Sequence, residues 1–471
     1  MSSVSALNSL LSSSTSTSSS IDLSSILQAA TGSSSSGIDV TAAVNSAITA
    51  ARAPETGWQN QQTALQNEAS ALSTLQTQTS NLDNDVVALG SLAGPLSART
   101  VSSSNSSIVS ASAAAGSASG THVVVVSNLA TTASWTSGVF ASSSSVLPAG
   151  SFTITVGTGS PATITTDGTQ SLSAVVSQIN SQNLGVTARV VTDASGSRLA
   201  LVSDTSGSAA NFTINTAVVG YGFSRAATGN NASLTVDGIG ISSATNTVTG
   251  TVPGLTLNLV GAATGVSVSL GVAPDTSQAA SAINQFVTDY NALISSLNTQ
   301  FTFNGSSEGA LAGDSVVRDL QSQILTTLSY TYAPATGTTS VPNLSSLGIR
   351  VNNDGTLTVN STTLQNTLAS NFSDAQSFFQ GTNMNGFSNA LDQKLSDFTS
   401  PGSGAFTVDL KTINSQYNDL QDTIDSFETN YITPLKAQLN SEYSQAEILL
   451  QQLPTQMQQI NTMLGLNTKT S

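Results

Sequence analysis

The sequence predicts an α+β multidomain protein, in which coiled-coil helices from both chain ends enclose antiparallel β-rich domains. Apolar residues recur with helical spacing from about residue 39 to 90 and again from 410 to 464. Between about residues 100 and 272, apolar and polar residues alternate, and Gly, Asn and Asp separate the runs, as in short strands. At 471 residues the chain is too long for one compact core.

The N-terminal part changes from a low-complexity segment to helix. Residues 1–37 are rich in Ser and Thr, so we expect them to be disordered alone and to fold on assembly. A helix is expected from about Asp39 to Ala51, and Pro54 interrupts it. The next helix carries heptads up to Gly90; apolar or small residues repeat at Trp58, Leu65, Leu72, Thr79 and Val86, with Leu75, Leu82 and Leu89 between them.

The C-terminal part shows the same spacing. Apolar residues alternate by three and four from Leu410 to Tyr431, slip by an extra four at Leu435 and Leu439, and then continue to Leu464. Pro434 and Pro454 lie in this pattern, and each should start or kink a helix. We expect the two ends to pair, antiparallel or in one bundle. The seam residues predicted to stabilise this leg are Trp58, Leu65, Leu72, Leu75, Leu82, Leu420, Ile424 and Phe427.

The middle of the chain reads as short strands with a few helices. Strands are expected in HVVVVSNL, SFTITVGT, GVTARVV, SRLALVSD, SLTVDGIGI, LTLNLV and VSVSLGV, with a helix over Leu172–Ile179. Helices are also expected over Ala279–Phe301, around Val316–Leu328, and from Thr362 to Phe378-Phe379, with a hairpin turn at Asn353-Asp354-Gly355. The sheets are expected at the far end from the two termini.

These patterns predict four parts. A terminal part comprises residues 1–52 and 437–471 and forms a coiled coil on assembly. A helical leg comprises 53–105 and 276–436, including the small hairpin. One β-rich head domain comprises 106–145 and 225–275, and a second comprises 146–224.

Composition excludes several classes of function. Only 8% of residues are charged and the net charge is −15, so we expect neither nucleic acid nor anionic membrane as a partner. The absence of Cys excludes disulfides and thiolate chemistry. The N-terminus lacks the positive and apolar regions of a cleaved signal, and no run is long enough to span a bilayer.

Candidates for catalysis or metal binding are few. His122 is the sole histidine and opens a strand, so a structural role is expected. Ser307 lies in a G-x-S-x-G match, but the context is polar and lacks α/β alternation, which favours a surface loop. The run Asn352–Gly355 hints at a calcium loop but lacks the bidentate Glu, so a tight turn is favoured. No catalytic residue, cofactor or metal is expected.

The stretch SSSSGIDVTAAVNSAITAARAP combines Gly37-Ile38-Asp39, a short helix and Arg52-Ala53-Pro54. In this it resembles the N-terminal signature of the flagellar filament cap family, the second hook-associated proteins, although serines replace that family's first glycines. LSAVVSQINSQNLGVTARVVTDASGSRLALVSDTSG resembles the sheet repeat of flagellin and hook-associated proteins. AINQFVTDYNALISSLN, GALAGDSVVRDLQSQI and SLGIRVNNDGTLTVNSTTLQNTLASNFSDAQSFFQG resemble successive cap blocks, with Asn360 where the family more often has Asp.

The resemblance implies a non-enzymatic subunit secreted by the flagellar export apparatus and assembled as a ring, expected to be a pentamer, at the distal filament tip. It implies that the cap promotes flagellin polymerisation and prevents loss of exported monomers, with adhesion as a secondary role. The implied partners are a second copy, flagellin, the hook–filament junction proteins and an export chaperone at the C-terminus. The residues predicted for terminal docking are Leu450, Leu453, Met457, Ile460 and Leu464.

Three alternatives remain open at this point. A hook–filament junction protein or flagellin would carry long N-terminal heptads from its first residues, which this chain lacks. A surface adhesin would use the β-rich domains to bind glycans or mucin. A hydrolase would use Ser307.

Overall fold

The structure, a computed structural model, describes residues 40–302 and 309–463. The expectations for residues 1–37, Ser307 and Leu464 fall outside this range. The predicted fold class is confirmed, because long helices from both chain ends pack together and antiparallel sheets lie between them in sequence. The chain divides into two compact units, one made of residues up to 81, 292–323 and from 394, the other of 82–291 and 324–393.

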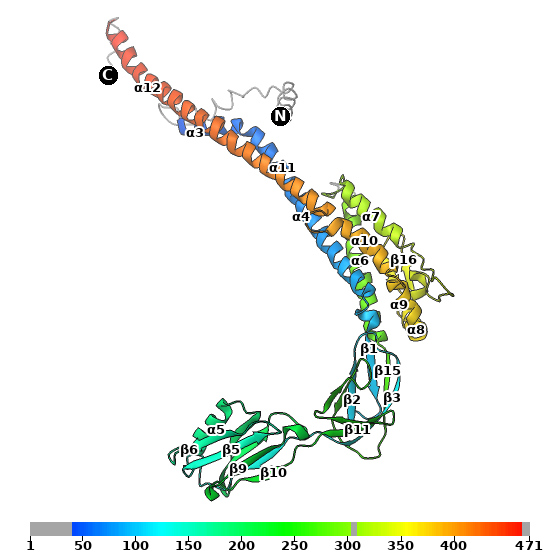
Figure 1. The fold of residues 1–471 in the computed structure, drawn as a ribbon. Helices are drawn as coiled ribbons and strands as arrows, with labels where there is room; N and C mark the ends of the chain where they lie inside the picture. Colours follow the sequence, from blue (N-terminus) through cyan, green and yellow to red (C-terminus); the bar gives the residue numbers. More distant parts are fainter. Residues whose placement is uncertain (1–39, 303–308, 464–471) are drawn as a thin grey trace. The chain divides into compact units, whose positions relative to one another are not determined.

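The first unit is helical (Figure 1). The helices that contribute to it, four of which continue into the second unit, are α3 (Val40–Ala51), α4 (Ala53–Gly90), α6 (Thr276–Phe301), α7 (Ser315–Thr327), α10 (Phe387–Thr399), α11 (Ala405–Phe427) and α12 (Thr433–Met463). α4 and α11 run antiparallel, because Gln62 contacts Gln421 and Gln76 contacts Thr407. Pro54 is the second residue of α4, where a missing N–H costs no helical hydrogen bond.

The predicted stutter corresponds to a π turn, η5 (Glu428–Ile432), between α11 and α12. The N–H of Thr433 donates to the carbonyl of Glu428, five residues back, which shifts the helix by one residue. Pro434 follows immediately and has no N–H to continue the regular ladder. Pro434 therefore lies at the start of α12, whereas Pro454 lies inside it.

In the second unit, one β-rich core lies between two antiparallel sheets. The first sheet has the order β1 (Arg99–Ser103), β15 (Val268–Pro274), β3 (Gly120–Asn128), β11 (Ala232–Val236), β12 (Ile239–Ser243); the second has β13 (Thr247–Thr249), β14 (Leu255–Leu259), β2 (Val109–Ala113). Alternate residues such as Val124, Val126, Leu255 and Leu257 point into the core. SLTVDGIGI, predicted as one strand, is a hairpin, because Asp237 and Gly238 both have positive φ and form a two-residue turn.

A second β-rich core includes the helix predicted over Leu172–Ile179, α5 (Leu172–Ser181). Its sheets have the orders β10 (Ser224–Ala227), β4 (Ser134–Thr136), β8 (Gly196–Ser203), β7 (Val186–Asp193) and β6 (Ala162–Thr166), β5 (Gly150–Val156), β9 (Phe212–Thr216). Ser171 caps α5, since its side chain accepts a hydrogen bond from the Ala174 N–H. Short 3₁₀ turns lie at η2 (Ser208–Ala210) and η3 (Val219–Tyr221).

The remainder of the second unit packs helices around aromatic rings. Its further elements are η1 (Pro95–Ser97), η4 (Leu344–Leu347), β16 (Ile349–Val351), β17 (Leu357–Val359), α8 (Ser361–Ser370) and α9 (Phe372–Gln380). The helix predicted from Thr362 to Phe379 is wrong as a single element, because it breaks at Asn371 into α8 and α9. Phe286, Phe378 and Phe387 form its aromatic centre, with ring centroids 5.3 to 5.9 Å apart in the contacting pairs.

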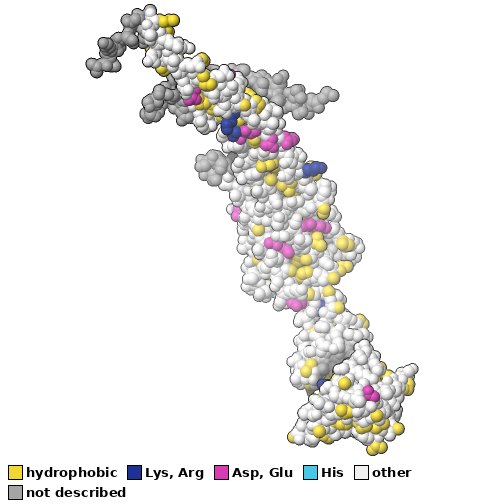
Figure 2. Space-filling view, turned by 90° about the vertical axis from the view of Figure 1, so that its left-hand side faces the viewer, with side chains coloured by type: hydrophobic (Ala, Val, Ile, Leu, Met, Phe, Trp, Pro, Cys, Tyr) yellow, Lys and Arg dark blue, Asp and Glu magenta, His cyan; other side chains and the backbone are white. Residues whose placement is uncertain are grey.

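The surface is largely neutral. In Figure 2 most of the visible face is white, with scattered apolar side chains and few charged ones. Ser, Thr, Asn, Gln and Gly therefore form much of the surface that ions usually occupy.

Candidate assembly surfaces

The seam residues predicted on α4 and α11 differ in burial. Leu72, Leu75 and Leu82 are at most 1% exposed, and Ile424 is 7% exposed. Trp58, Leu65, Leu420 and Phe427 are only partly buried. The heptad positions are thus fully buried in the C-terminal half of α4 and only partly buried toward its start.

The partly buried part of the seam is held by polar and aromatic contacts. Trp58 meets Phe427 edge to face, with ring centroids 5.2 Å apart. Gln66 donates to the Tyr417 hydroxyl at 3.1 Å. A hollow of about 450 Å³ lies beside Leu65 and Leu420, which explains why neither leucine is fully buried. Pairing of α4 with α11 is therefore incompletely packed at this level.

The start of α12 is anchored on α3. Val44, Ile48 and Ile432 form a small buried cluster, against which Leu435, Leu439 and Tyr443 pack. Arg52, just after α3, contacts the Glu428 carboxylate at 2.7 Å. These contacts end at Tyr443, so they do not extend over the second half of α12.

Beyond Tyr443, α12 leaves its apolar residues exposed. Leu450, Leu453, Met457 and Ile460, the described members of the predicted docking set, are 43, 48, 59 and 53% exposed. Ile448, Leu449 and Met463 are also exposed. We call residues 448–463 the exposed segment of α12. Spacings of three and four place much of this apolar surface on one side of the helix.

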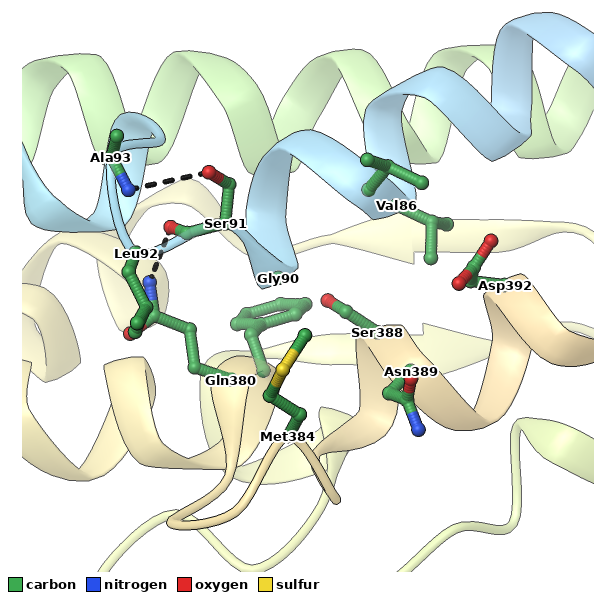
Figure 3. Close-up of a pocket in the computed structure, with 12 residues that line it drawn as sticks. Val86, Gly90, Ser91, Leu92, Ala93, Gln380, Met384, Ser388, Asn389 and Asp392 are labelled. Atoms are coloured by element: carbon green, nitrogen blue, oxygen red, sulfur yellow. Dashed lines mark hydrogen bonds between the residues drawn. The ribbon is translucent and has the colours of Figure 1, made fainter.

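A pocket of about 470 Å³ lies where the end of α4 meets α9 and α10 (Figure 3). Val87, Leu92, Phe379 and Met384 supply apolar walls, and Ser388 and Asp392 supply polar atoms. We call this the α4–α10 pocket. The sequence analysis did not predict it, since its walls come from segments about 290 residues apart.

Carboxyl groups meet at three helix contacts. Burial, and to a smaller extent the facing Asp392 carboxyl, raises the pKa of Asp83 to about 6. Burial, and to a smaller extent a hydrogen bond with Asp289, raises the pKa of Asp85 to about 6. Burial and then Asp314, with a smaller contribution from Glu68, likewise raise the pKa of Asp409 to about 6. Each contact therefore favours a shared proton over two adjacent negative charges.

The catalytic and metal candidates have structural explanations. His122 Nδ1 lies 2.8 Å from Asp237, whose other carboxylate oxygen accepts from the Val123 N–H, so the histidine helps to hold the β11–β12 turn. Asp354 accepts hydrogen bonds from the N–H and hydroxyl of Thr356, which makes the 352–355 run a tight turn. Within residues 40–302 and 309–463, no cluster of His, Cys, Asp and Glu is suited to a metal ion. In the same ranges no helix has the length and apolarity needed to cross a membrane.

Two models of one family match most of the chain. The N-terminal model of flagellar hook-associated protein 2 matches residues 36–133, and its C-terminal model matches residues 229–458. The flagellin hook IN motif matches residues 151–205, within the second β-rich core. The predicted resemblance is therefore confirmed.

Individual relatives agree. The chain is 28% identical over 463 residues to flagellar hook-associated protein 2 of Escherichia coli K12, covering 88% of this chain and 96% of that protein. It is 28% identical over 371 residues to the B-type flagellar hook-associated protein 2 of Pseudomonas aeruginosa PAO1, covering 72% and 75%. The crystal structure of the D1-D2-D3 domains of the flagellar cap protein FliD from Escherichia coli matches with a TM-score of 0.60 and 25% identity, covering 73% of this chain and 99% of that one.

These findings confirm the prediction of a structural rather than an enzymatic protein, and they exclude the hydrolase alternative. The chain belongs to the flagellar hook-associated protein 2 family, and it is a cap protein of the flagellar filament tip, where this family oligomerises.

Proposed function

We propose that this cap promotes flagellin polymerisation and retains exported subunits by docking the exposed segment of α12 at the growing tip. The observation that carries the proposal is the contrast within one helix. Leu435 and Leu439 are covered by α3, whereas Leu450, Leu453 and Met457 have no cover within the described chain. Apolar side chains that stay in water on an isolated helix are a feature of partner-binding segments.

The chemistry of this segment favours weak, reversible binding. An isolated helix is marginally stable, so part of the docking free energy is spent on ordering it. Residues 448–463 include no charged side chain, and Glu447 lies just before them, so few ion pairs can strengthen the contact. A cap that must make room for each new subunit needs a contact of this kind.

The same proposal assigns the parts and partners. The terminal part (1–52 and 437–471) docks, and the leg (53–105 and 276–436) supports it through the seam residues. The two β-rich head domains lie between the two leg segments in the sequence. The partners are a second copy in a ring, expected to be a pentamer, then flagellin, the hook–filament junction proteins and a C-terminal export chaperone. Secretion through the flagellar export apparatus and a secondary role in adhesion complete the proposal.

A truncation tests it in a cap-deleted strain. Removing residues 446–471 keeps Leu435, Leu439 and Tyr443 on α3 and deletes the exposed segment, so the fold should survive. We expect circular dichroism to show folded protein, while motility fails and flagellin monomer accumulates in the medium. The double substitution Leu453→Ser with Met457→Ser should act in the same direction. Gln452→Ser with Gln456→Ser, two exposed polar positions on the same helix, is the matched control. Normal motility of the truncated strain would contradict the proposal.

A further inference from the structure

The α4–α10 pocket has the size of a binding site. Its volume of about 470 Å³ lies within the usual range for ligand pockets, about 300–1,000 Å³. Figure 3 shows Met384 and Ser388, from the α9–α10 connection and α10, facing Gly90 and Leu92 at the end of α4. A Cβ at position 90 would lie 3.0 Å from the Ser388 Cβ, so glycine at this position lets the two elements approach closely.

The rim of the pocket exposes large apolar side chains. Leu92 is 74% exposed, Met384 is 70% exposed and Val87 is 51% exposed. Met384 also has φ of +55°, a conformation that costs a non-glycine residue energy. Asn383 and Asn385 flank it and adopt this conformation more easily, yet the apolar residue occupies the strained position. The backbone therefore holds an apolar side chain in solvent beside an apolar hollow.

One polar group in the pocket is without a partner. Ser388 is 2% exposed, and its buried hydroxyl makes no hydrogen bond with any residue that the structure describes. By contrast, Gln380 is satisfied, because its side-chain nitrogen donates to the Ser91 carbonyl at 2.8 Å (Figure 3). A buried hydroxyl without a partner is unfavourable, so an occupant with a carbonyl oxygen near Ser388 would be favoured.

The charge of the pocket indicates that its occupant carries a positive charge. Asp392 lies at one end and contacts the Asp83 carboxyl, and none of the described lining residues is basic. A cation placed there would allow both carboxyls to ionise and would pair with them. The fitting occupant has an apolar side chain and, about one helical turn away, a Lys or Arg.

The chain itself offers such a helix face on α11. Val408 is 53% exposed, and Lys411, three residues later on the same face, is exposed as well. Within the described residues Lys411 has no carboxylate within ion-pair distance. Because members of this family gather in oligomers at the filament tip, copies of α11 are present at high local concentration.

We propose that the α4–α10 pocket receives α11 of a second copy of this chain, with Val408 between Leu92 and Met384 and Lys411 beside Asp392. The contact is a helix laid in an apolar groove with one charge pair at its edge. It is head-to-tail, since pocket and helix are different surfaces, and such contacts build rings when the rotation closes. The inference rests on oligomerisation of the family and does not depend on docking by α12.

Site-specific photo-crosslinking of the full chain tests the proposal. A benzophenone amino acid replaces Leu92, and in a control protein it replaces Ile239, which is 68% exposed in the β12 strand. Irradiation of the oligomer should give a covalent dimer from the position-92 protein, and mass spectrometry should locate the link in α11 near Val408. A link to flagellin, to another surface of the second copy, or no dimer above the control would overturn it.

Substitutions give an independent readout by sedimentation. Leu92→Asp and Lys411→Glu should each weaken self-association about tenfold or more, as expected for a central anchor and its charge pair. Ile239→Asp should leave self-association unchanged. If either Leu92→Asp or Lys411→Glu associates normally, the proposal fails. Flagellin leakage after α12 truncation reports on the proposed function alone, so failure of either idea can be told apart.

Discussion

Raising the pH from about 5 to about 7.5 is expected to destabilise the helices, because three helix contacts bring carboxyl groups together. Asp83 on α4 faces Asp392 on α10, and Asp85, one half-turn along α4, faces Asp289 on α6. One oxygen of Asp83 and one of Asp85 are buried without a hydrogen-bond donor. Two carboxylates offer acceptors only, so a hydrogen bond between them forms only when one carboxyl is protonated.

The third contact involves a helix cap. Asp314 Oδ1 accepts from the Val316 N–H at 2.7 Å and caps α7. Asp409 on α11 faces it, and burial and then Asp314 raise the pKa of Asp409 to about 6. Burial and Asp314 also raise the pKa of Glu68 on α4, which faces the same point.

The sign follows from these raised pKa values. A carboxyl whose pKa rises from 3.8 in the unfolded chain to about 6 in the folded chain binds its proton more readily when folded. The stabilisation is therefore fully present below about pH 4 and is lost as the pH rises through about 6. The carboxyls whose pKa is lowered by side-chain and backbone hydrogen bonds act in the opposite direction only near or below about pH 4; they include Asp167, Asp193 and Asp354.

The magnitude over this pH range is about 1.5 kcal/mol in total. A shift from 3.8 to about 6 corresponds to about 3 kcal/mol for a fully buried group. Asp83, Asp85 and Asp409 are only partly buried, and solvent screening reduces the effect to about 1 kcal/mol each. The loss proceeds from about pH 4 to about pH 6, so a rise from about pH 5 to about pH 7.5 covers roughly half of it. Over this range the three groups together should lower the free energy of unfolding by about 1.5 kcal/mol, and the Tm by a few degrees.

Calorimetry of a triple variant tests this reasoning. Asp83→Asn, Asp85→Asn and Asp409→Asn replace each proton-sharing carboxyl with an amide that donates at every pH. We expect this variant to melt above the native chain at about pH 7.5 and to show a much flatter pH dependence. Asp422→Asn, an exposed position on α11, is the control. A native Tm that does not fall over this range, or a triple variant as pH-dependent as the native chain, would refute the argument.

Three further substitutions probe local features by denaturant unfolding. Leu72→Ala should lower the free energy of unfolding by about 2–5 kcal/mol, because Leu72 is fully buried in the α4 seam; a loss below about 1 kcal/mol would mean that the seam is loosely packed there. Tyr290→Phe should cost about 1 kcal/mol, since the buried hydroxyl donates to the Gly355 carbonyl at 2.9 Å, and an unchanged stability would show that this bond contributes nothing. Asn360→Asp should change stability by less than about 1 kcal/mol, because either side chain can accept from the Thr363 N–H as the cap of α8.

Local periodicity explains most of what the sequence predicts correctly. The heptad pattern in α4 repeats about four times, so its spacing predicts both the helix and the face that is buried. The stutter at Leu435 and Leu439, with Pro434 beside it, indicates a change of register, and the structure has a π turn there. Strands bounded by glycine are likewise visible as alternation.

The features that sequence reasoning missed depend on short or distant signals. The turn in SLTVDGIGI consists of Asp237 and Gly238 alone, and the apolar alternation resumes after it with a slip of only one residue, so the segment reads as one strand. The α4–α10 pocket and the Asp83–Asp392 contact join segments about 300 residues apart. Neither has a local pattern, so only the tertiary fold brings them together.

The burial of apolar residues along the paired helices also bears on how the cap works. In α4 the packing is complete from Leu72 onward and incomplete at Trp58 and Leu65, and in α12 it stops after Tyr443. Segments with few buried contacts open at low free energy cost, whereas well-packed ones open only with the whole unit. Among the described residues, the start of α4 and the end of α12 are therefore the parts that open most easily. The proposed docking would therefore change contacts at the start of α4 and the end of α12 without disturbing the well-packed part of the seam from Leu72 onward.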